Sequence, residues 1–249
     1  FSRSNETNIT MKHIIWALRL LAFYIGIIPA TIIISTCGWL CAPLPAIYCY
    51  RIITSWSHFF IWWAKVICGL KYEVSGIENL PPAPYVVLCN HESMWETIFM
   101  QVLLPPQSWV LKRELLWIPF FGWGLALIKP IAVFRDRLAD VKFILQQGKK
   151  RIAQGRCVVF YPEGTRMAPG KTRRFSRTGA ALAIAAQVPV VPIAHNAGNF
   201  WPRGPWIKRS GTITVHIGEP IQPSADASAI TSAAEAWIAS AKENMSPHG

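Results

Sequence analysis

The N-terminal part of the chain consists of two long apolar runs with a short break between them. The run over residues 14–39 is long enough, as a helix rising ~1.5 Å per residue, to cross a hydrocarbon core of ~30 Å. A second run, residues 52–70, follows a connector that contains Pro43 and Pro45, and a proline cannot continue a helix. The pattern predicts a two-helix hairpin within residues 1–70.

The pattern changes at residue 71, where short β-branched runs begin to alternate with helical stretches. Strands are predicted over residues 85–89, 108–111, 128–134, 157–161, 190–195 and 212–217. Helices are predicted over residues 93–104, 114–123, 138–154, 176–187 and 224–245, the last as an amphipathic cap on the fold. Alternation of this kind indicates an α/β domain, residues 71–249, with a mostly parallel or mixed sheet covered by helices.

Composition favours a membrane-embedded hairpin. Hydrophobic residues make up 52% of the chain and charged residues 15%, whereas soluble domains have roughly 25% charged residues. No charged residue occurs between residues 20 and 50, while Lys12 precedes the hairpin and Lys71 follows it. The positive-inside rule then predicts that both ends face the cytoplasm. We expect the protein in the inner (cytoplasmic) membrane, with the α/β domain on the cytoplasmic side.

Three residues leave the depth of insertion open. Arg19 and Lys65 interrupt the apolar runs, and Pro29 is expected to kink the first helix. The hairpin therefore either crosses the bilayer or enters one leaflet, with its charged side chains extended toward the surface.

Most of the positive charge lies in one block, and this limits the classes of ligand. The chain has 25 Lys and Arg against 13 Asp and Glu, and the excess is concentrated within residues 112–177. Such a surface attracts phosphate groups. Nucleic acid is disfavoured as a partner because no DNA- or RNA-binding motif accompanies the block. The six cysteines form no CxxC pair, so neither a zinc site nor a disulfide framework is predicted.

A candidate acid–base pair follows the first predicted strand of the α/β domain. His91 stands between that strand and a helix, and Glu96 follows five residues later. A carboxylate that accepts the Nδ1–H of histidine leaves Nε2 free to take a proton. A purely structural histidine is the alternative. Ser93 and Cys89 lie nearby but not in a GxSxG elbow, so a hydrolase triad is not supported.

A second candidate site follows the strand that ends at Tyr161. The turn Glu163-Gly164-Thr165-Arg166 is followed by a run of basic residues. Exposed backbone N–H groups and an arginine fork are suited to phosphate oxygens. A solvated basic loop would have the same composition, and the segment alone leaves both interpretations open.

Four ordered motifs resemble those of the glycerolipid acyltransferase family, and in particular its lysophosphatidic acid acyltransferases. They are Asn90-His91 with Glu96, Lys112-x-Glu114-Leu115-xxx-Pro119-xx-Gly122, Tyr161-Pro162-Glu163-Gly164-Thr165-Arg166, and Val188-Pro189-Val190-Val191-Pro192-Ile193. The family usually has Asp at the position of Glu96 and Phe at that of Tyr161. Related lipid A acyltransferases have a His-x4-Glu pattern but typically lack the Glu-Gly-Thr-Arg element.

The resemblance implies a reaction and a role for each motif residue. A fatty acyl group would pass from acyl-CoA or acyl carrier protein to the sn-2 hydroxyl of lysophosphatidic acid, forming phosphatidic acid. His91 and Glu96 would be catalytic, and no metal or other cofactor would be needed. The substrate-binding residues would be Lys112, Arg113, Glu163, Gly164, Thr165 and Arg166, with Glu163 orienting the glycerol. The alternatives are another acyl acceptor, such as a lyso-ornithine lipid or other lysophospholipid, and a basic membrane scaffold without catalysis.

Overall fold

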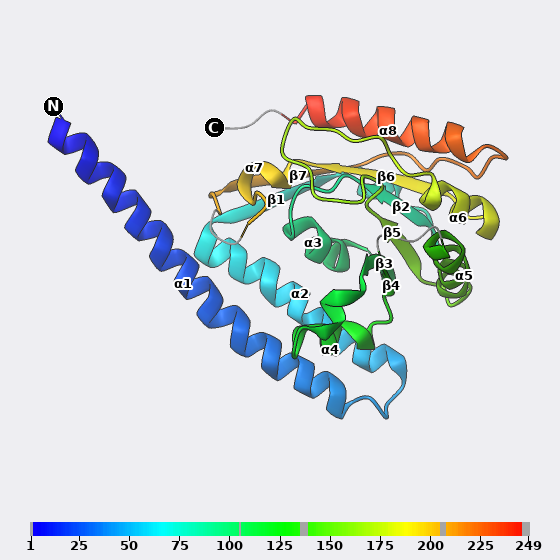
Figure 1. The fold of residues 1–249 in the computed structure, drawn as a ribbon, viewed down its shortest axis with the longest axis horizontal. Coiled ribbons are helices and arrows are strands. Elements are labelled where there is room, and N and C mark those ends of the chain that lie inside the picture. Colours follow the sequence, from blue (N-terminus) through cyan, green and yellow to red (C-terminus); the bar gives the residue numbers. More distant parts are fainter. Residues whose placement is uncertain (1, 105, 135–138, 205–207, 246–249) are drawn as a thin grey trace.

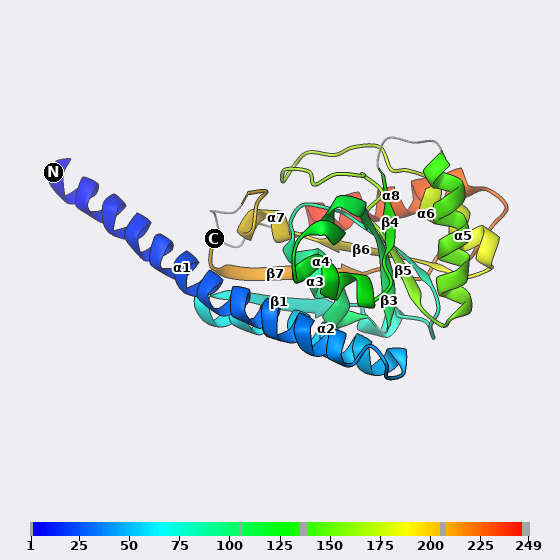
Figure 2. The same cartoon turned by 60° about the horizontal axis from the view of Figure 1, so that its bottom comes forward.

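The chain begins with two helices joined by a short turn, as predicted. In the computed structural model, which describes residues 2–104, 106–134, 139–204 and 208–245, α1 spans Ser2–Leu40 and α2 spans Ala46–Cys68. The side chains of residues 2–16, 139 and 140 are not described. Figures 1 and 2 show the two helices side by side, with the N-terminal half of α1 extending beyond the rest of the molecule.

Over Ala17–Leu40, helix α1 is apolar and mostly exposed. Among the described residues it is the one helix whose length and composition are sufficient to cross a membrane, over Ala17–Leu40, and 11% of its most apolar window is buried. Leu21, Ile25, Ile28 and Ile33 are all more than half exposed. Exposing so many large apolar side chains to water is unfavourable, so this face of α1 is suited to a lipid environment.

Helix α2 differs from the second membrane helix that the sequence predicts, because one of its faces belongs to the protein core. Ile53, Phe60 and Ala64 recur at helical spacing and are at most 8% exposed, whereas Trp62 on the opposite face is 54% exposed. The buried face shares one hydrophobic cluster with residues of the sheet, such as Val87. The hydrophobic core of the α/β domain therefore continues into α2.

A single sheet of seven strands organises the remainder, in the order β1-β7-β6-β2-β5-β3-β4. Neighbouring strands are parallel except for β6 and β7, which are antiparallel. The strands are β1 Leu70–Ser75, β2 Val86–Cys89, β3 Gln107–Lys112, β4 Ile131–Val133, β5 Cys157–Phe160, β6 Val190–His195 and β7 Gly211–Ile217. The predicted α/β fold with a mixed sheet is confirmed.

The strands alternate their side chains between two helical layers. In β2, Val87 and Cys89 belong to the cluster beneath α2 and α3, whereas Val86 and Leu88 belong to the cluster beneath α6 and α8. Figures 1 and 2 show these layers on opposite sides of the sheet. The remaining helices are α3 Trp95–Leu103, α4 Phe121–Leu127, α5 Ala139–Ala153, α6 Thr178–Ala186, α7 Ala197–Phe200 and α8 Ala227–Glu243, with 3-10 helices η1 Ile77–Asn79 and η2 Arg113–Trp117.

The short helices η1 and α7 were not predicted, and two larger differences concern β1 and the segment after β3. Strand β1 was not predicted, because its exposed residues are mostly polar and it lies at the edge of the sheet. The single helix predicted over residues 114–123 is wrong: η2 ends at Trp117 and α4 begins at Phe121. Between them Pro119 and Phe120, the latter with φ of 59°, interrupt the helical backbone.

We predict that Phe60→Ala lowers the free energy of unfolding by about 3–5 kcal/mol, the usual cost of truncating a buried phenylalanine. Phe60 is 1% exposed, and its ring centroid lies 5.4 Å from those of Phe23 on α1 and Trp201 after α7. Chemical unfolding of the full chain in detergent measures the change. Trp62→Ala, on the exposed face of α2, is the matched control. Equal small losses in the two variants would show that α2 is not part of the core.

Candidate active site

The turn after β2 joins His91 to a buried carboxylate. Strand β2 ends at Cys89, His91 follows in the turn, and Glu96 lies in the first turn of α3. Glu96 Oε1 is 2.8 Å from His91 Nδ1, and the Glu96 side chain has 0% of its surface exposed. The same oxygen accepts the backbone N–H groups of Glu92, at 3.1 Å, and Ser93, at 2.9 Å. The local backbone thus fixes the carboxylate that faces the imidazole.

These contacts determine how the His91 ring is held. Because an ionised Glu96 only accepts hydrogen bonds, Nδ1 carries the proton that it donates, and Nε2 remains as a proton acceptor. The ring of Tyr161 stacks on the imidazole, with centroids 4.3 Å apart and an interplanar angle of 26°. The His91 side chain is 14% exposed. Glu96 therefore fixes one edge of the ring and Tyr161 covers one face, but a ligand can still reach the imidazole.

The environment of Glu96 favours its charged form. Burial raises the pKa of the Glu96 carboxyl, whereas the nearby His195 ring, and the hydrogen bond and charge of His91, lower it. The lowering effects prevail, and the pKa of Glu96 lies below its ordinary value. At neutral pH Glu96 is accordingly an anion and can stabilise an imidazolium at His91.

Asn90 connects the end of β2 to the end of β6. Its Nδ2 donates to the carbonyl of His195, and its Oδ1 accepts the backbone N–H of His195, both at 3.0 Å. In return His195 Nε2 lies 2.8 Å from the carbonyl oxygen of Asn90. His195 is 0% exposed. The asparagine before His91 therefore fixes the start of the turn to a neighbouring strand.

Glu163 contacts the backbone of His91 and does not line the cavity beside the histidine. Its role in orienting the glycerol stays a prediction. Its Oε2 accepts the backbone N–H of His91 at 2.8 Å, and the residue is 5% exposed. Burial raises the pKa of the Glu163 carboxyl to about 7, against the lowering effect of the His91 N–H and of Lys242. The carboxylate supports the turn that carries the histidine.

Parallel pairing brings the predicted motifs to one edge of the sheet. Leu88 of β2 pairs with Phe160 of β5, and Trp109 of β3 pairs with Val159 of β5. The carboxyl ends of the three strands therefore lie together, which is where ligands bind in open α/β sheets.

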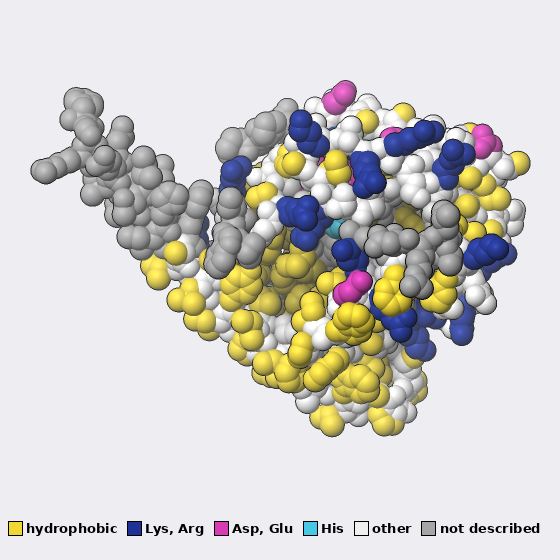
Figure 3. Space-filling model, viewed as in Figure 1, with side chains coloured by type: hydrophobic (Ala, Val, Ile, Leu, Met, Phe, Trp, Pro, Cys, Tyr) yellow, Lys and Arg dark blue, Asp and Glu magenta, His cyan; other side chains and the backbone are white. Residues whose placement is uncertain are grey.

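A cavity of about 700 Å³ opens at this edge. Its polar part is lined by His91, Lys112, Thr165, Arg166 and Arg203. In Figure 3, basic side chains gather along one side of a hollow whose other walls are hydrophobic. Volumes of this size are usual for small-molecule sites.

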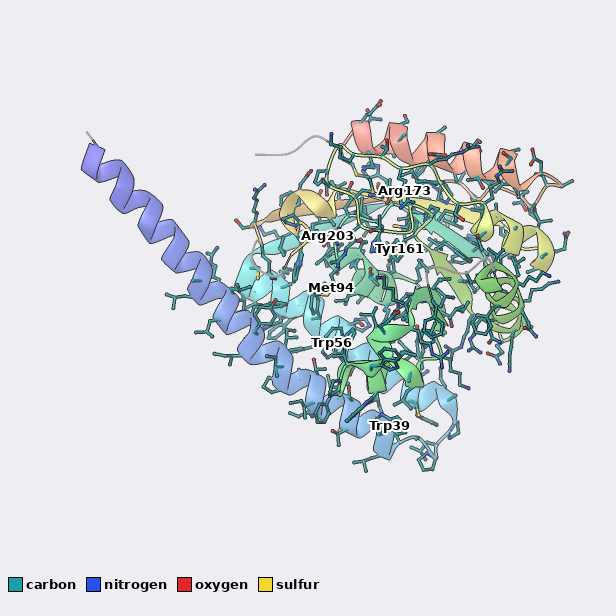
Figure 4. All side chains as sticks on the ribbon, viewed as in Figure 1. Trp39, Trp56, Met94, Tyr161, Arg173 and Arg203 are labelled. Atoms are coloured by element: carbon teal, nitrogen blue, oxygen red, sulfur yellow. The ribbon has the colours of Figure 1, made fainter. Side chains whose placement is uncertain are left out.

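The apolar part of the cavity is built by the N-terminal helices together with α3 and α4. Its lining includes Phe23, Ile27, Ile53, Trp56, Phe60, Ile98 and Leu125. In Figure 4, Arg203 and Tyr161 lie on the sheet side, Met94 lies below them, and Trp56, a residue of α2, lies below Met94. Two polar groups in this wall pair with each other, since Trp56 Nε1 donates to Thr31 Oγ1 at 2.9 Å. An elongated, largely apolar ligand with an anionic end would match both parts.

Some predicted residues lie away from the cavity, and one basic residue that lines it, Arg203, was not predicted. The guanidinium of Arg113 stacks over the Phe134 ring at 4.9 Å, and Gly164, with φ of 71°, forms the turn after β5. Neither lines the cavity. Arg203 does, but its sequence surroundings, Pro202 and Gly204, carry no motif that would have identified it. Within the described ranges, no group of three or more His, Cys, Asp or Glu could hold a metal ion.

Known proteins are similar to this chain in sequence and in fold. The Acyltransferase family model matches residues 71–196. The chain is 42% identical over 239 residues to the 1-acyl-sn-glycerol-3-phosphate acyltransferase of Pseudomonas aeruginosa, and the match covers 93% of each protein. It is 36% identical over 161 residues to the human 1-acyl-sn-glycerol-3-phosphate acyltransferase alpha, covering 63% of this chain and 57% of that protein.

A solved structure has the same fold at lower sequence similarity. The crystal structure of the 1-acyl-sn-glycerophosphate (LPA) acyltransferase, PlsC, from Thermotoga maritima matches with a TM-score of 0.80 and 20% identity, over 96% of this chain and 98% of that one. The ordered motifs, the extent of the family match and the identity to the Pseudomonas protein agree. The chain belongs to the acyltransferase family.

Proposed function

We propose that this protein transfers a fatty acyl group from a thioester, acyl-CoA or acyl carrier protein, to the sn-2 hydroxyl of 1-acyl-sn-glycerol-3-phosphate, forming phosphatidic acid. The observation that carries the proposal is that His91, paired with Glu96, lines the same cavity as a group of basic residues and a large apolar wall. The names of the Pseudomonas and human relatives support the same substrate.

The basic part of the cavity would bind the acceptor phosphate. Lys112, Thr165 and Arg166 come from the predicted phosphate-binding motifs, and Arg203 adds a cation from a segment distant in sequence. An arginine fork and a lysine ammonium are suited to a phosphate monoester, which carries up to two negative charges. The acyl chain of the acceptor would then lie along the apolar wall, with the glycerol next to His91.

In the proposed reaction, His91 Nε2 takes the proton of the sn-2 hydroxyl as the oxygen attacks the thioester carbonyl. The negative charge of Glu96 stabilises the imidazolium that results. When the tetrahedral intermediate collapses, the carbon–sulfur bond breaks, and the proton on His91 passes to the departing thiolate. The products are the new ester and a free thiol, and the histidine regains its initial state.

The exposed apolar face of α1 supports association with a bilayer, which also contains the acceptor and the product. The proposal includes both depths of insertion, since α1 is long and apolar enough to span the bilayer and could also enter one leaflet. A location at the inner membrane, with the catalytic side toward the cytoplasm, follows from the distribution of lysine and arginine around the hairpin and completes the proposal.

The purified protein in detergent should release thiol from acyl-CoA or acyl carrier protein only when lysophosphatidic acid is present, because attack by the acceptor hydroxyl breaks the thioester. A thiol-reactive dye measures the release, and mass spectrometry identifies the lipid product. Thiol release only with a different lysolipid would show that this lysolipid, and not lysophosphatidic acid, is the acceptor. The absence of thiol release with every lysolipid and both donors would leave a non-catalytic scaffold.

Glu96→Gln should lower kcat by at least ~10², because the amide keeps the size of the side chain but loses the charge that stabilises the imidazolium; the equivalent change in the Ser-His-Asp triad costs ~10⁴. His91→Ala should cost as much or more. The double variant should be little worse than His91→Ala, since the pair acts as one unit. Glu73→Gln, on an exposed residue of β1, is the control. Wild-type turnover in a folded Glu96→Gln variant would contradict the pairing.

Arg166→Lys keeps the charge but loses the two-pronged fork, so acceptor binding should weaken by ~1.5–3 kcal/mol. Donor affinity should remain unchanged. Initial-rate kinetics with each substrate varied in turn separates the two effects. Arg173→Lys, an exposed position that does not line the cavity, is the matched control. Equal losses for donor and acceptor would exclude Arg166 from the acceptor site.

A further inference from the structure

A second carboxylate directly follows His91 and is also buried. The Glu92 side chain is 2% exposed, and its Oε1 lies 2.6 Å from the Nζ of Lys242. Its Oε2 accepts the backbone N–H of Gly198, in α7, at 3.1 Å. Lys242 belongs to the last turn of α8 and is 19% exposed. The sequence suggested that this helix only caps the fold, but the structure connects it to the turn that carries the histidine.

The approach of α7 to Glu92 is close. A Cβ atom added to Gly198 would lie 2.8 Å from both Cβ and Oε2 of Glu92, which is nearer than real Cβ atoms come. Glycine at this position therefore allows the backbone N–H to reach the carboxylate. Both oxygens of Glu92 have a partner, so the side chain is held at two points by elements far away in the sequence.

Charge explains why the lysine is needed. Glu92, Glu96 and Glu163 are all at most 5% exposed and lie around the same turn. An ionised carboxylate is costly in the interior unless donors or cations surround it. Glu96 pairs with the ring of His91, and Glu163 accepts the backbone N–H of His91. Glu92 instead forms an ion pair with Lys242. The charge of Lys242 also extends to Glu163, where it opposes the effect of burial on the pKa.

The backbone of Glu92 transmits this anchoring to the catalytic pair. Its N–H donates to Glu96 Oε1, the same oxygen that faces His91 Nδ1. A shift of the Glu92 side chain moves the peptide that carries this donor, and with it the orientation of the carboxylate. Displacements of ~1 Å in a catalytic group can cost about 10²-fold in rate.

We propose that Lys242 is a positioning residue for the acyl transfer, which acts by holding Glu92 and thereby fixes the backbone donor that orients Glu96 toward His91. The inference depends on the proposed function only for its kinetic readout. Lys242 does not line the cavity, so the proposed role requires no contact with the substrate.

Lys242→Met, which keeps the length of the side chain and removes its charge, should lower kcat roughly 10- to 100-fold and leave the KM for lysophosphatidic acid unchanged. Lys242→Arg should retain most of the activity. Adding Glu92→Gln to Lys242→Met should recover part of the loss, because no buried charge then lacks a partner. Lys149→Met, at an exposed position on α5, is the control. Wild-type kcat in folded Lys242→Met, or no recovery in the double variant, would overturn the proposal.

A second readout separates this inference from the proposed reaction. The Nδ1–H proton of His91 should give a strongly downfield NMR signal in the wild-type protein, assigned through His91→Ala, because it is held by Glu96. The signal should weaken or shift in Lys242→Met and persist in Lys149→Met, even if lysophosphatidic acid proves not to be the acceptor. An unchanged signal in Lys242→Met would contradict the positioning role. Should Lys242→Met fail to fold, the double variant is tested by both readouts, and a wild-type kcat and signal would overturn the proposal.

Discussion

The site depends on keeping one carboxylate ionised inside the protein. Glu96 has no exposed surface, and its charge is sustained by two backbone N–H groups and by His91. The two backbone N–H groups point at the carboxylate only while the turn between β2 and α3 keeps this conformation. Asn90 fixes the start of that turn to β6, Glu163 holds the backbone of His91, and Glu92 connects the turn to α7 and α8. Much of the α/β fold therefore contributes to the orientation of one imidazole.

The second constraint is that a polar and an apolar part must meet at this imidazole. Parallel strands bring the ends of β2, β3 and β5 together, and with them the basic residues Lys112 and Arg166. The apolar part comes from α1 and α2, whose inner faces line the cavity and join the core. The same helix pair carries the exposed apolar surface of α1. An N-terminal segment that resembles a separable anchor thus also completes the cavity.

The sequence predicts the features that depend on local pattern. Periodicity predicts the helix pair and the succession of strands along the chain after residue 85. A spacing of five residues across a helix start predicts the contact of His91 with Glu96. Features that depend on distant contacts were not predictable. Arg203 and Lys242 occupy segments without a motif, and only the fold brings them to the cavity and to Glu92. The burial of one face of α2 was likewise hidden, because a membrane helix and a core helix can have the same composition.

The most direct test of this account is a structure determined with lysophosphatidic acid bound and a non-reactive thioether analogue of the donor. The account predicts the acceptor phosphate within hydrogen-bond distance of Lys112 and Arg166, the sn-2 oxygen within hydrogen-bond distance of His91 Nε2, and the acyl chain along the wall formed by α1 and α2. A phosphate bound instead on the exposed basic loop of residues 168–177, with the sn-2 oxygen away from His91, would contradict it.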